Sequence, residues 1–303
     1  MANKVVLLST LIPTSIIILF MLLILILYYV KKNDFLKQLR QYPSFSEEDL
    51  KNPTIKFQYE NKTNENLTLL RVKYNLDTIA GNGSDIEQVL NLMRWTHMLA
   101  RRAPNPFFPE KLNALSLLHL IETTKQKLNC YMYSTILNEV LLSMGFKSRK
   151  IHMKPMKKDH KESHVIIVVY SKTLAKWILL DPDFCAYLKD EEGTILGLLE
   201  IREKIIKNEP LFVNKEQQYN IGGILGLIAN PIKRKMYVWY LSKNIFRFTT
   251  ALHSAFDYDT RGKKREYLEL IPLGYDDDMD TKSIVNKTIT TTTTTNSKLF
   301  WKD

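Results

Sequence analysis

Cys130 is the residue of this chain whose position most favours covalent chemistry. Asn129 is a good N-cap and Gly145 a good C-terminal stop, so a helix is expected over 130–144 with the cysteine in its first turn. The free amides and the dipole at a helix N-terminus favour the thiolate, which is the nucleophilic form of cysteine. The alternative is an inert thiol that packs as a small hydrophobic side chain. A base close to the sulfur would favour the first interpretation.

A histidine and an aspartate that could serve such a thiol lie on a predicted β-hairpin. Residues 164–170 and 176–181 are two apolar runs, the first of them rich in β-branched side chains. A four-residue loop between them would set His164 directly opposite Asp181, with Cβ atoms about 4.5–5.5 Å apart. The carboxylate then fixes the imidazole and leaves its other nitrogen for a thiol. Asp183 is the alternative carboxylate.

Thiol, imidazole and carboxylate together are the groups that thiol acyl transfer requires. The imidazole takes the proton of Cys130, and Asp181 orients the imidazole and stabilises its charged form. The developing oxyanion would be held by the Cys130 backbone N–H and one upstream donor, for which Gln126, Asn129 and Trp95 are candidates.

The elements that must position these groups predict an α+β fold. Helical periodicity and caps, among them a capping box of Ser84 and Glu87, predict helices over 84–102, 113–125, 130–144, 195–207 and 235–255. Alternation of apolar and polar side chains predicts further strands over 55–59, 68–74 and 267–271.

Several of these stretches share a family pattern. They are Trp95-Thr-His97, Leu128-Asn-Cys130-Tyr-Met-Tyr-Ser134, Leu141-Leu-Ser-Met-Gly145-Phe-Lys-Ser-Arg149-Lys-Ile151, Ser163-His164-Val165 and Trp177-Ile-Leu-Leu-Asp181-Pro182. Together they resemble the transglutaminase-like superfamily of papain-fold thiol enzymes, over about residues 67–187. The resemblance implies a central helix that carries the cysteine and packs on an antiparallel sheet. It also implies the catalytic triad Cys130, His164 and Asp181.

The N-terminal region predicts a membrane anchor. Residues 5–30 carry no charge and are almost continuously apolar in their second half, and such a run is long enough to cross a hydrocarbon core of about 30 Å. No cleavage pattern follows it, so a retained single span is expected rather than a signal peptide. Basic residues at 31–40 favour a cytoplasmic body, whereas the resemblance to membrane-anchored bacterial-type members favours an extracytoplasmic or periplasmic one, which we expect.

Charge and composition restrict the partners. The chain has 43 Lys and Arg against 32 Asp and Glu, a net charge of +11 that suits an anionic partner. The basic residues follow no nucleic-acid recognition motif, so we expect no nucleic acid. Two cysteines exclude a disulfide scaffold, and Cys185 is expected to be a buried thiol. The histidines His152, His160 and His164 lack the spacing of a closed zinc site, so neither a metal nor a cofactor is expected.

These patterns divide the chain into successive regions. They are an N-terminal flank (1–4), the anchor (5–30), a stalk with a first strand (31–66), the transglutaminase-like domain (67–190), a helical and strand extension (191–275) and a disordered tail (276–303). The sequence thus predicts a membrane-anchored thiol enzyme that hydrolyses an amide bond of a peptide or protein. The alternative is a catalytically silent binding or scaffold domain of the same fold at the cell envelope.

Overall fold

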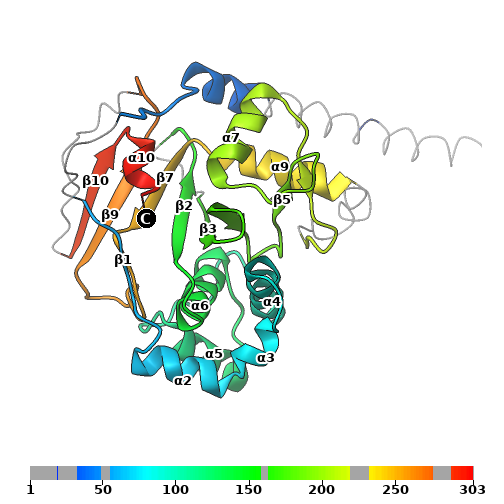
Figure 1. The fold of residues 1–303 in the computed structure, drawn as a ribbon. Helices are drawn as coiled ribbons and strands as arrows, with labels where there is room; N and C mark the ends of the chain where they lie inside the picture. Colours follow the sequence, from blue (N-terminus) through cyan, green and yellow to red (C-terminus); the bar gives the residue numbers. More distant parts are fainter. Residues whose placement is uncertain are drawn as a thin grey trace, which may run out of the picture.

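A sheet with helices on both faces organises the described part of the chain (Figure 1). The computed structural model describes residues 19, 33–48, 55–157, 163–218, 232–275 and 288–302. The sheet has the order β10 (Ile289–Thr294), β9 (Arg265–Leu270), β7 (Arg247–Ala251), β2 (Ser148–Lys154), β3 (His164–Ser171) and β4 (Lys176–Leu180). β10 runs parallel to β9, and every other neighbouring pair is antiparallel.

The first helical layer is built around one buried helix. It contains α2 (Glu65–Lys73), α3 (Leu76–Ala80), α4 (Asp85–Met98), α5 (Ala114–Thr124) and α6 (Cys130–Ser143). Figure 1 shows these helices gathered at one side of the sheet. α6 contacts β3 and β2 and is itself surrounded by α2, α4 and α5, so its residues from Met132 onward are buried. This burial holds the start of α6 at a fixed place beside the sheet.

The second layer covers the opposite face. It contains α7 (Leu198–Lys207), α9 (Lys233–Asn244) and the helical residues 33–41. Successive side chains of β3 point to opposite faces of the sheet. Ile167 and Val169 pack in the core under α6. Ile166 and Val168 pack in the core under α7 and α9. β3 is therefore buried on both faces, which explains its nearly continuous apolar sequence.

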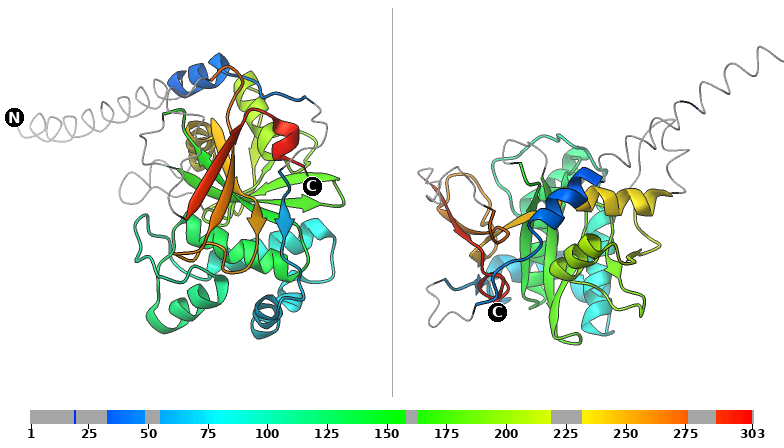
Figure 2. Two further views of the ribbon diagram at one scale, coloured as in Figure 1. Left: turned by 90° about the vertical axis from the view of Figure 1, so that its left-hand side faces the viewer. Right: turned by 90° about the horizontal axis from the view of Figure 1, so that it is seen from above.

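Short elements complete the edges of the fold (Figure 2). β1 (Gln58–Tyr59) pairs with β8 (His253–Ser254), β5 (Leu188–Lys189) pairs with β6 (Phe212–Val213), and α10 (Ser297–Phe300) follows β10. The Arg149 guanidinium lies 4.1 Å from the ring centre of Phe57 and 4.2 Å from that of Trp177. It also donates a hydrogen bond of 2.9 Å to the carbonyl oxygen of Phe300. One buried cation therefore connects the residue before β1 with β2, β4 and α10.

Several predicted elements are confirmed and others are wrong. Ser84 and Glu87 form the capping box that opens α4, and Asn129 caps α6. Residues 68–74, predicted as a strand, lie within α2 apart from the last of them, because the buried Leu67 and Leu70 follow a helical spacing.

The C-terminal half differs most from expectation. The helix predicted over 235–255 ends at Asn244, and β7 begins at Arg247. β7 and β9, which belong to the predicted extension over 191–275, lie in the same sheet as β3. The threonine tract within the predicted disordered tail forms β10, because β9 offers its free edge for pairing.

The predicted membrane anchor is corrected. Residues 5–30, except Leu19, lie outside the described residues. Among the residues that the structure describes, no helix has both the length and the apolar character needed to span a membrane. The longest described helices, α4 and α6, have 14 residues each, or about 21 Å, against a hydrocarbon core of about 30 Å. The transmembrane helix in the predicted fold class, the membrane as a partner and the single-pass localisation at the membrane are therefore not retained, and the described residues form a mixed α+β fold.

Candidate active site

Cys130 is the first residue of α6, as the sequence predicts. The Asn129 side chain accepts a hydrogen bond of 3.1 Å from the backbone N–H of Met132, which fixes the first turn of the helix. Cys130 is partly exposed, whereas most of α6 beyond it is buried. The thiol therefore lies at the boundary between the core and solvent.

His164 is the first residue of β3 and is fully buried. Its Nε2 lies 2.6 Å from Oδ2 of Asp181, which directly follows β4. The imidazole is enclosed by aromatic rings, with ring centres 5.4 Å away at Phe184 and 5.1 Å away at Tyr240. The structure thus brings together the histidine and the aspartate that the sequence pairs.

The Asp181 carboxylate is held by further donors. Oδ1 accepts hydrogen bonds from the backbone N–H groups of Asp183 (3.1 Å) and Phe184 (3.3 Å). Oδ2 accepts a second hydrogen bond, of 2.8 Å, from the Tyr237 hydroxyl on α9. These hydrogen bonds fix the orientation of the Asp181 carboxylate, and the carboxylate in turn fixes the orientation of the His164 ring.

The surroundings favour a charged imidazole. Burial alone lowers the pKa of His164, but the charges of Asp181 and Tyr240 and the hydrogen bonds to Asp181 and Cys130 together raise that pKa well above its usual value. A protonated imidazole beside the sulfur stabilises the thiolate. The pair can therefore supply a nucleophile and a proton at the same place.

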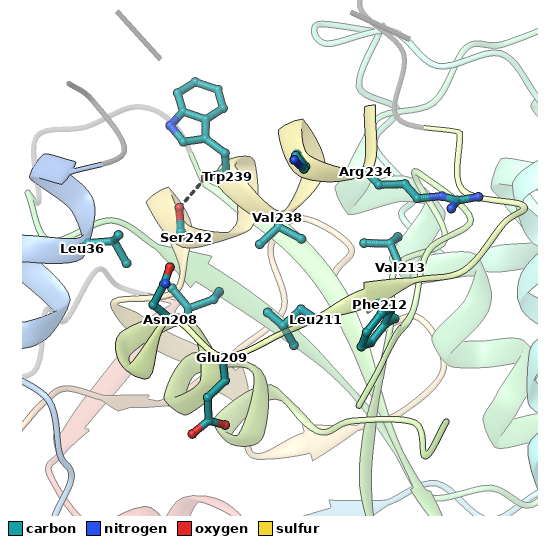
Figure 3. Close-up of a pocket in the computed structure, with 12 residues that line it drawn as sticks. Leu36, Asn208, Glu209, Leu211, Phe212, Val213, Arg234, Val238, Trp239 and Ser242 are labelled. Atoms are coloured by element: carbon teal, nitrogen blue, oxygen red, sulfur yellow. Dashed lines mark hydrogen bonds between the residues drawn. The ribbon is translucent and has the colours of Figure 1, made fainter. Parts of the chain in front are cut away.

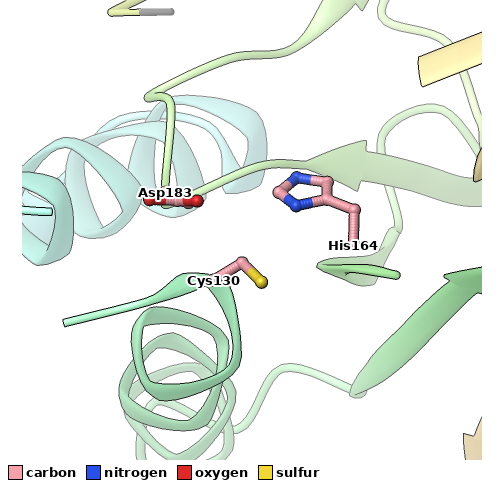
Figure 4. Close-up of side chains that lie close together, drawn as sticks. All are labelled: Cys130, His164 and Asp183. Atoms are coloured by element: carbon pink, nitrogen blue, oxygen red, sulfur yellow. The ribbon is translucent and has the colours of Figure 1, made fainter. Parts of the chain in front are cut away.

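The thiol lies on the other side of the imidazole from Asp181. Figure 4 shows the ring nitrogen next to Cγ, Nδ1, turned toward the Cys130 sulfur, with Asp183 beside both. One ligand atom each of Cys130, His164 and Asp183 lie within 4.8 Å of one another. Asp183, the alternative carboxylate of the sequence, is thus part of the site without replacing Asp181. This set of sulfur, nitrogen and oxygen atoms could also hold a metal ion.

Arg102 is a member of the site that the sequence does not indicate. Its Nε donates a hydrogen bond of 2.9 Å to Oδ2 of the buried Asp183, and its guanidinium lies 4.9 Å from the ring centre of Phe184. Burial raises the pKa of Asp183, while the charge of Arg102 opposes that rise. Arg102 is also close enough to Cys130 for their charges to interact. A cation thus stands near both the carboxylate and the thiol.

The three oxyanion candidates have different places. Asn129 lies next to Cys130 and caps its helix. Gln126 is turned elsewhere, since its Nε2 donates to the carbonyl oxygens of Phe107 and Lys127. Trp95 packs against Tyr74, with ring centres 6.0 Å apart. Of the three candidates, Asn129 is the one beside the nucleophile.

Cys185 has the surroundings of an inert thiol. It belongs to the core under α6, and burial raises its pKa to about 11. Such a thiol carries little thiolate near neutral pH. The two cysteines therefore differ in their surroundings, since Cys130 is partly exposed and Cys185 is buried.

A separate groove lies away from this site (Figure 3). Its volume is about 360 Å³, and it is lined by residues of α7, β6 and α9 together with Leu36. None of Cys130, His164 and Asp181 contributes to its wall. The groove and the candidate active site are therefore different places.

Comparisons with known proteins give no relative from which a function could be inferred. No protein-family model matches the chain, and neither a curated protein nor a solved structure matches it. The function of the site is therefore argued from its own residues.

Proposed function

We propose that this protein is a thiol enzyme that cleaves an amide or peptide bond through Cys130, His164 and Asp181. The observation that carries the proposal is the position of His164 between the other two groups. Its Nε2 lies 2.6 Å from Asp181 Oδ2, and its Nδ1 faces the sulfur. This is the arrangement in which an imidazole can exchange a proton with a thiol while a carboxylate holds it in place.

The first half-reaction uses the thiolate as nucleophile. The Cys130 sulfur attacks the carbonyl carbon, and the carbonyl π electrons move to oxygen to give a tetrahedral oxyanion. As the C–N bond breaks, His164 gives its proton to the leaving amine. The products are a free amine and a thioester on Cys130, with His164 neutral and Asp181 still ionised.

The second half-reaction restores the enzyme. Neutral His164 takes a proton from water, and the hydroxide formed attacks the thioester carbonyl. The C–S bond breaks, which releases a carboxylic acid and returns the thiolate beside the protonated imidazole. An amine in place of water would give a new amide. We favour hydrolysis, because Cys130 is partly exposed and water can reach its thioester.

The substrate is proposed to be an amide of a peptide or protein. The resemblance of the motifs around Cys130, Arg149, His164 and Asp181 to transglutaminase-like enzymes supports that class. The rival is a silent binding domain of the same fold, which would tolerate replacement of the nucleophile.

Alkylation by iodoacetamide tests the proposal without knowledge of the substrate. Near neutral pH, Cys130 should be modified at least about tenfold faster than Cys185, as followed by mass spectrometry of the digested protein. His164→Ala should slow modification of Cys130 by about tenfold or more. His164→Gln serves as a second variant of closer volume, and circular dichroism checks that each variant is folded.

Two controls sharpen this experiment. Cys185→Ala should leave the Cys130 rate unchanged, and Cys130→Ser should abolish the fast phase. Hydrolysis of a mixed set of fluorogenic peptide amides should disappear in Cys130→Ser and persist in Cys185→Ala. Slow and equal alkylation of both cysteines would overturn the proposal and favour the silent domain.

A further inference from the structure

Three different ligand atoms converge at the candidate active site. They belong to Cys130, His164 and Asp183, and they lie within 4.8 Å of one another. Asp183 is 1% exposed and His164 is 0% exposed, while Cys130 is partly exposed. Figure 4 shows the three side chains close together, with the sulfur, the imidazole ring and the carboxylate turned toward one another.

His164 Nδ1 is prepared to act as a ligand. The bond between Nε2 and Asp181 places the proton of a neutral imidazole on Nε2, which leaves the lone pair on Nδ1. A histidine that ligates a metal through one nitrogen commonly donates from the other to a carboxylate. Asp181 is fixed in turn by Tyr237, so the ligand nitrogen has a defined direction.

Asp183 also has one oxygen available as a metal ligand. Its Oδ2 is occupied by the hydrogen bond from Arg102, whereas Oδ1 is buried and has no hydrogen-bond partner among the described residues. Nδ1 of His164 is also buried, and its neighbour in the site is the Cys130 sulfur. Buried polar atoms without a partner are uncommon, because each costs about 1–3 kcal/mol. A buried carboxylate oxygen without a donor, beside a thiol and an imidazole nitrogen, is an arrangement that suits a positive ion.

The donor set favours zinc among common divalent ions. Sulfur, imidazole nitrogen and carboxylate oxygen are ligands that Zn²⁺ accepts together, and three protein ligands leave a fourth position for water or substrate. Mg²⁺ and Ca²⁺ prefer sites of oxygen alone. Zn–S bonds of about 2.3 Å and Zn–N bonds of about 2.0–2.1 Å set the ligand atoms roughly 3.3–3.6 Å apart in a tetrahedron. A modest movement of the partly exposed Cys130 would bring the atoms to that spacing.

Charge also fits a doubly positive ion. Thiolate and carboxylate carry two negative charges, which Zn²⁺ balances while His164 is neutral. On binding, the ion takes the place of the proton that His164 holds beside the sulfur, and that proton is released to solvent.

We propose that Zn²⁺ binds to Cys130 Sγ, His164 Nδ1 and Asp183 Oδ1. Bound zinc occupies both the nucleophile and the base, so it acts as a reversible inhibitor of cleavage. The inhibition rests on the proposed function, whereas the binding does not. The spacing of the histidines predicts no metal site. The proposed site escapes that criterion, because its ligands come from three separate parts of the chain.

The test uses Zn²⁺ and Co²⁺ as probes on the full chain freed of metal with a chelator. Calorimetry with zinc chloride should show one site with a dissociation constant in the micromolar range or tighter. Cobalt chloride should give the near-ultraviolet charge-transfer band of a thiolate ligand. Cys130→Ser should abolish the band, and Asp183→Asn should weaken zinc binding by about tenfold or more.

Matched controls separate this site from the surface. Cys185→Ala keeps one thiol, and Glu191→Gln removes an exposed carboxylate, so both should bind zinc like the unmodified chain. If Asp183→Asn fails to fold, Cys130→Ser at its partly exposed position still decides the matter. A cobalt band that survives in Cys130→Ser, or zinc affinity equal in Cys130→Ser and the controls, would overturn the proposal.

Alkylation distinguishes the two proposals. Zinc should block the reaction of Cys130 with iodoacetamide, and chelation should restore it. Zinc binding without fast alkylation of the metal-free chain would contradict the enzyme and support the metal site. Fast alkylation that zinc leaves unchanged would support the enzyme and overturn the metal site.

Discussion

His164 and Asp181 are hydrogen bonded although the strand register does not pair them. β3 and β4 align Ile167 with Leu180, and continued alignment would set residue 183 opposite His164. β4 ends at Leu180, and a backbone bridge between Asp181 and Ala186 closes a tight turn there. This turn directs Asp181 to His164 and leaves Asp183 for Arg102 and the thiol.

The two aspartates should therefore differ in their effects on the thiol. Asp181→Asn replaces the carboxylate that stabilises charged His164, so alkylation of Cys130 should slow by about tenfold, equivalent to about 1.4 kcal/mol. Asp183→Asn should change that rate by less than about threefold, because the imidazole keeps its partner. The rates are measured by mass spectrometry on metal-free protein. A larger effect of Asp183→Asn than of Asp181→Asn would contradict this prediction, because it would show that Asp183 orients the imidazole.

Tyr237 should be a positioning residue for Asp181. Tyr237→Phe removes the 2.8 Å donor to Oδ2, and a hydrogen bond to a charged group contributes about 1.5–3 kcal/mol. We expect a loss of unfolding free energy of that order in urea titrations, together with slower alkylation of Cys130. Tyr74→Phe is the matched control, because it removes an exposed bond to Glu122 and leaves the site intact. Equal effects of the two variants would contradict the role of Tyr237.

His152 should make the protein less stable in acid. Burial, with the charges of Lys154 and Lys150, lowers its pKa to about 3 from the usual 6.5. Between these values the unfolded chain takes up a proton that the folded chain refuses, so stability falls as the pH falls below 6.5.

This effect can be measured against a variant. From pH 7 to pH 5 the loss through His152 should be about 1–2 kcal/mol of unfolding free energy. His152→Gln should reduce the dependence on pH by that amount, and His119→Gln on the exposed side of α5 should leave it as it is. Identical pH profiles for the unmodified chain and His152→Gln would refute the prediction.

Arg149 should stabilise the fold as a planar cation. Arg149→Lys keeps the charge but loses the flat guanidinium that contacts the rings of Phe57 and Trp177 and donates to Phe300. We expect a loss of about 2–4 kcal/mol in unfolding free energy, since a buried charge loses its bonds. Arg71→Lys, at a more exposed pair with Asp77, should cost at most about 1 kcal/mol. Chemical denaturation compares the two.

Local signals in the sequence predict the parts of the site that depend on neighbours in the chain. Asn129, Cys130 and Gly145 define α6, which starts at the cysteine and is followed by the glycine at φ +85°. The hairpin register is two positions away from the predicted one. A shift of two keeps each side chain on its face, so His164 and Asp181 remain on the same side of the sheet.

The rest of the site depends on contacts that sequence spacing cannot reveal. Tyr237 is 56 positions from Asp181, and Arg102 is 81 positions from Asp183. Each contact depends on how a helix or loop packs on the sheet, and local periodicity holds no information on that. The aromatic run at 236–241 indicates that this segment packs against other residues. The sequence does not show which residues these are, and the fold places the segment in the core under α7 and α9.

The long separation between Asp181 and Tyr237 has a consequence for the newly made chain. Synthesis runs from the N-terminus, so Cys130 leaves the ribosome before His164, Asp181 and α9 in turn. Until Tyr237 has emerged and α9 has docked, the carboxylate lacks its hydroxyl donor and the imidazole lacks its final alignment. The surroundings of the Cys130 thiol are therefore completed late, by an element translated more than a hundred residues after it.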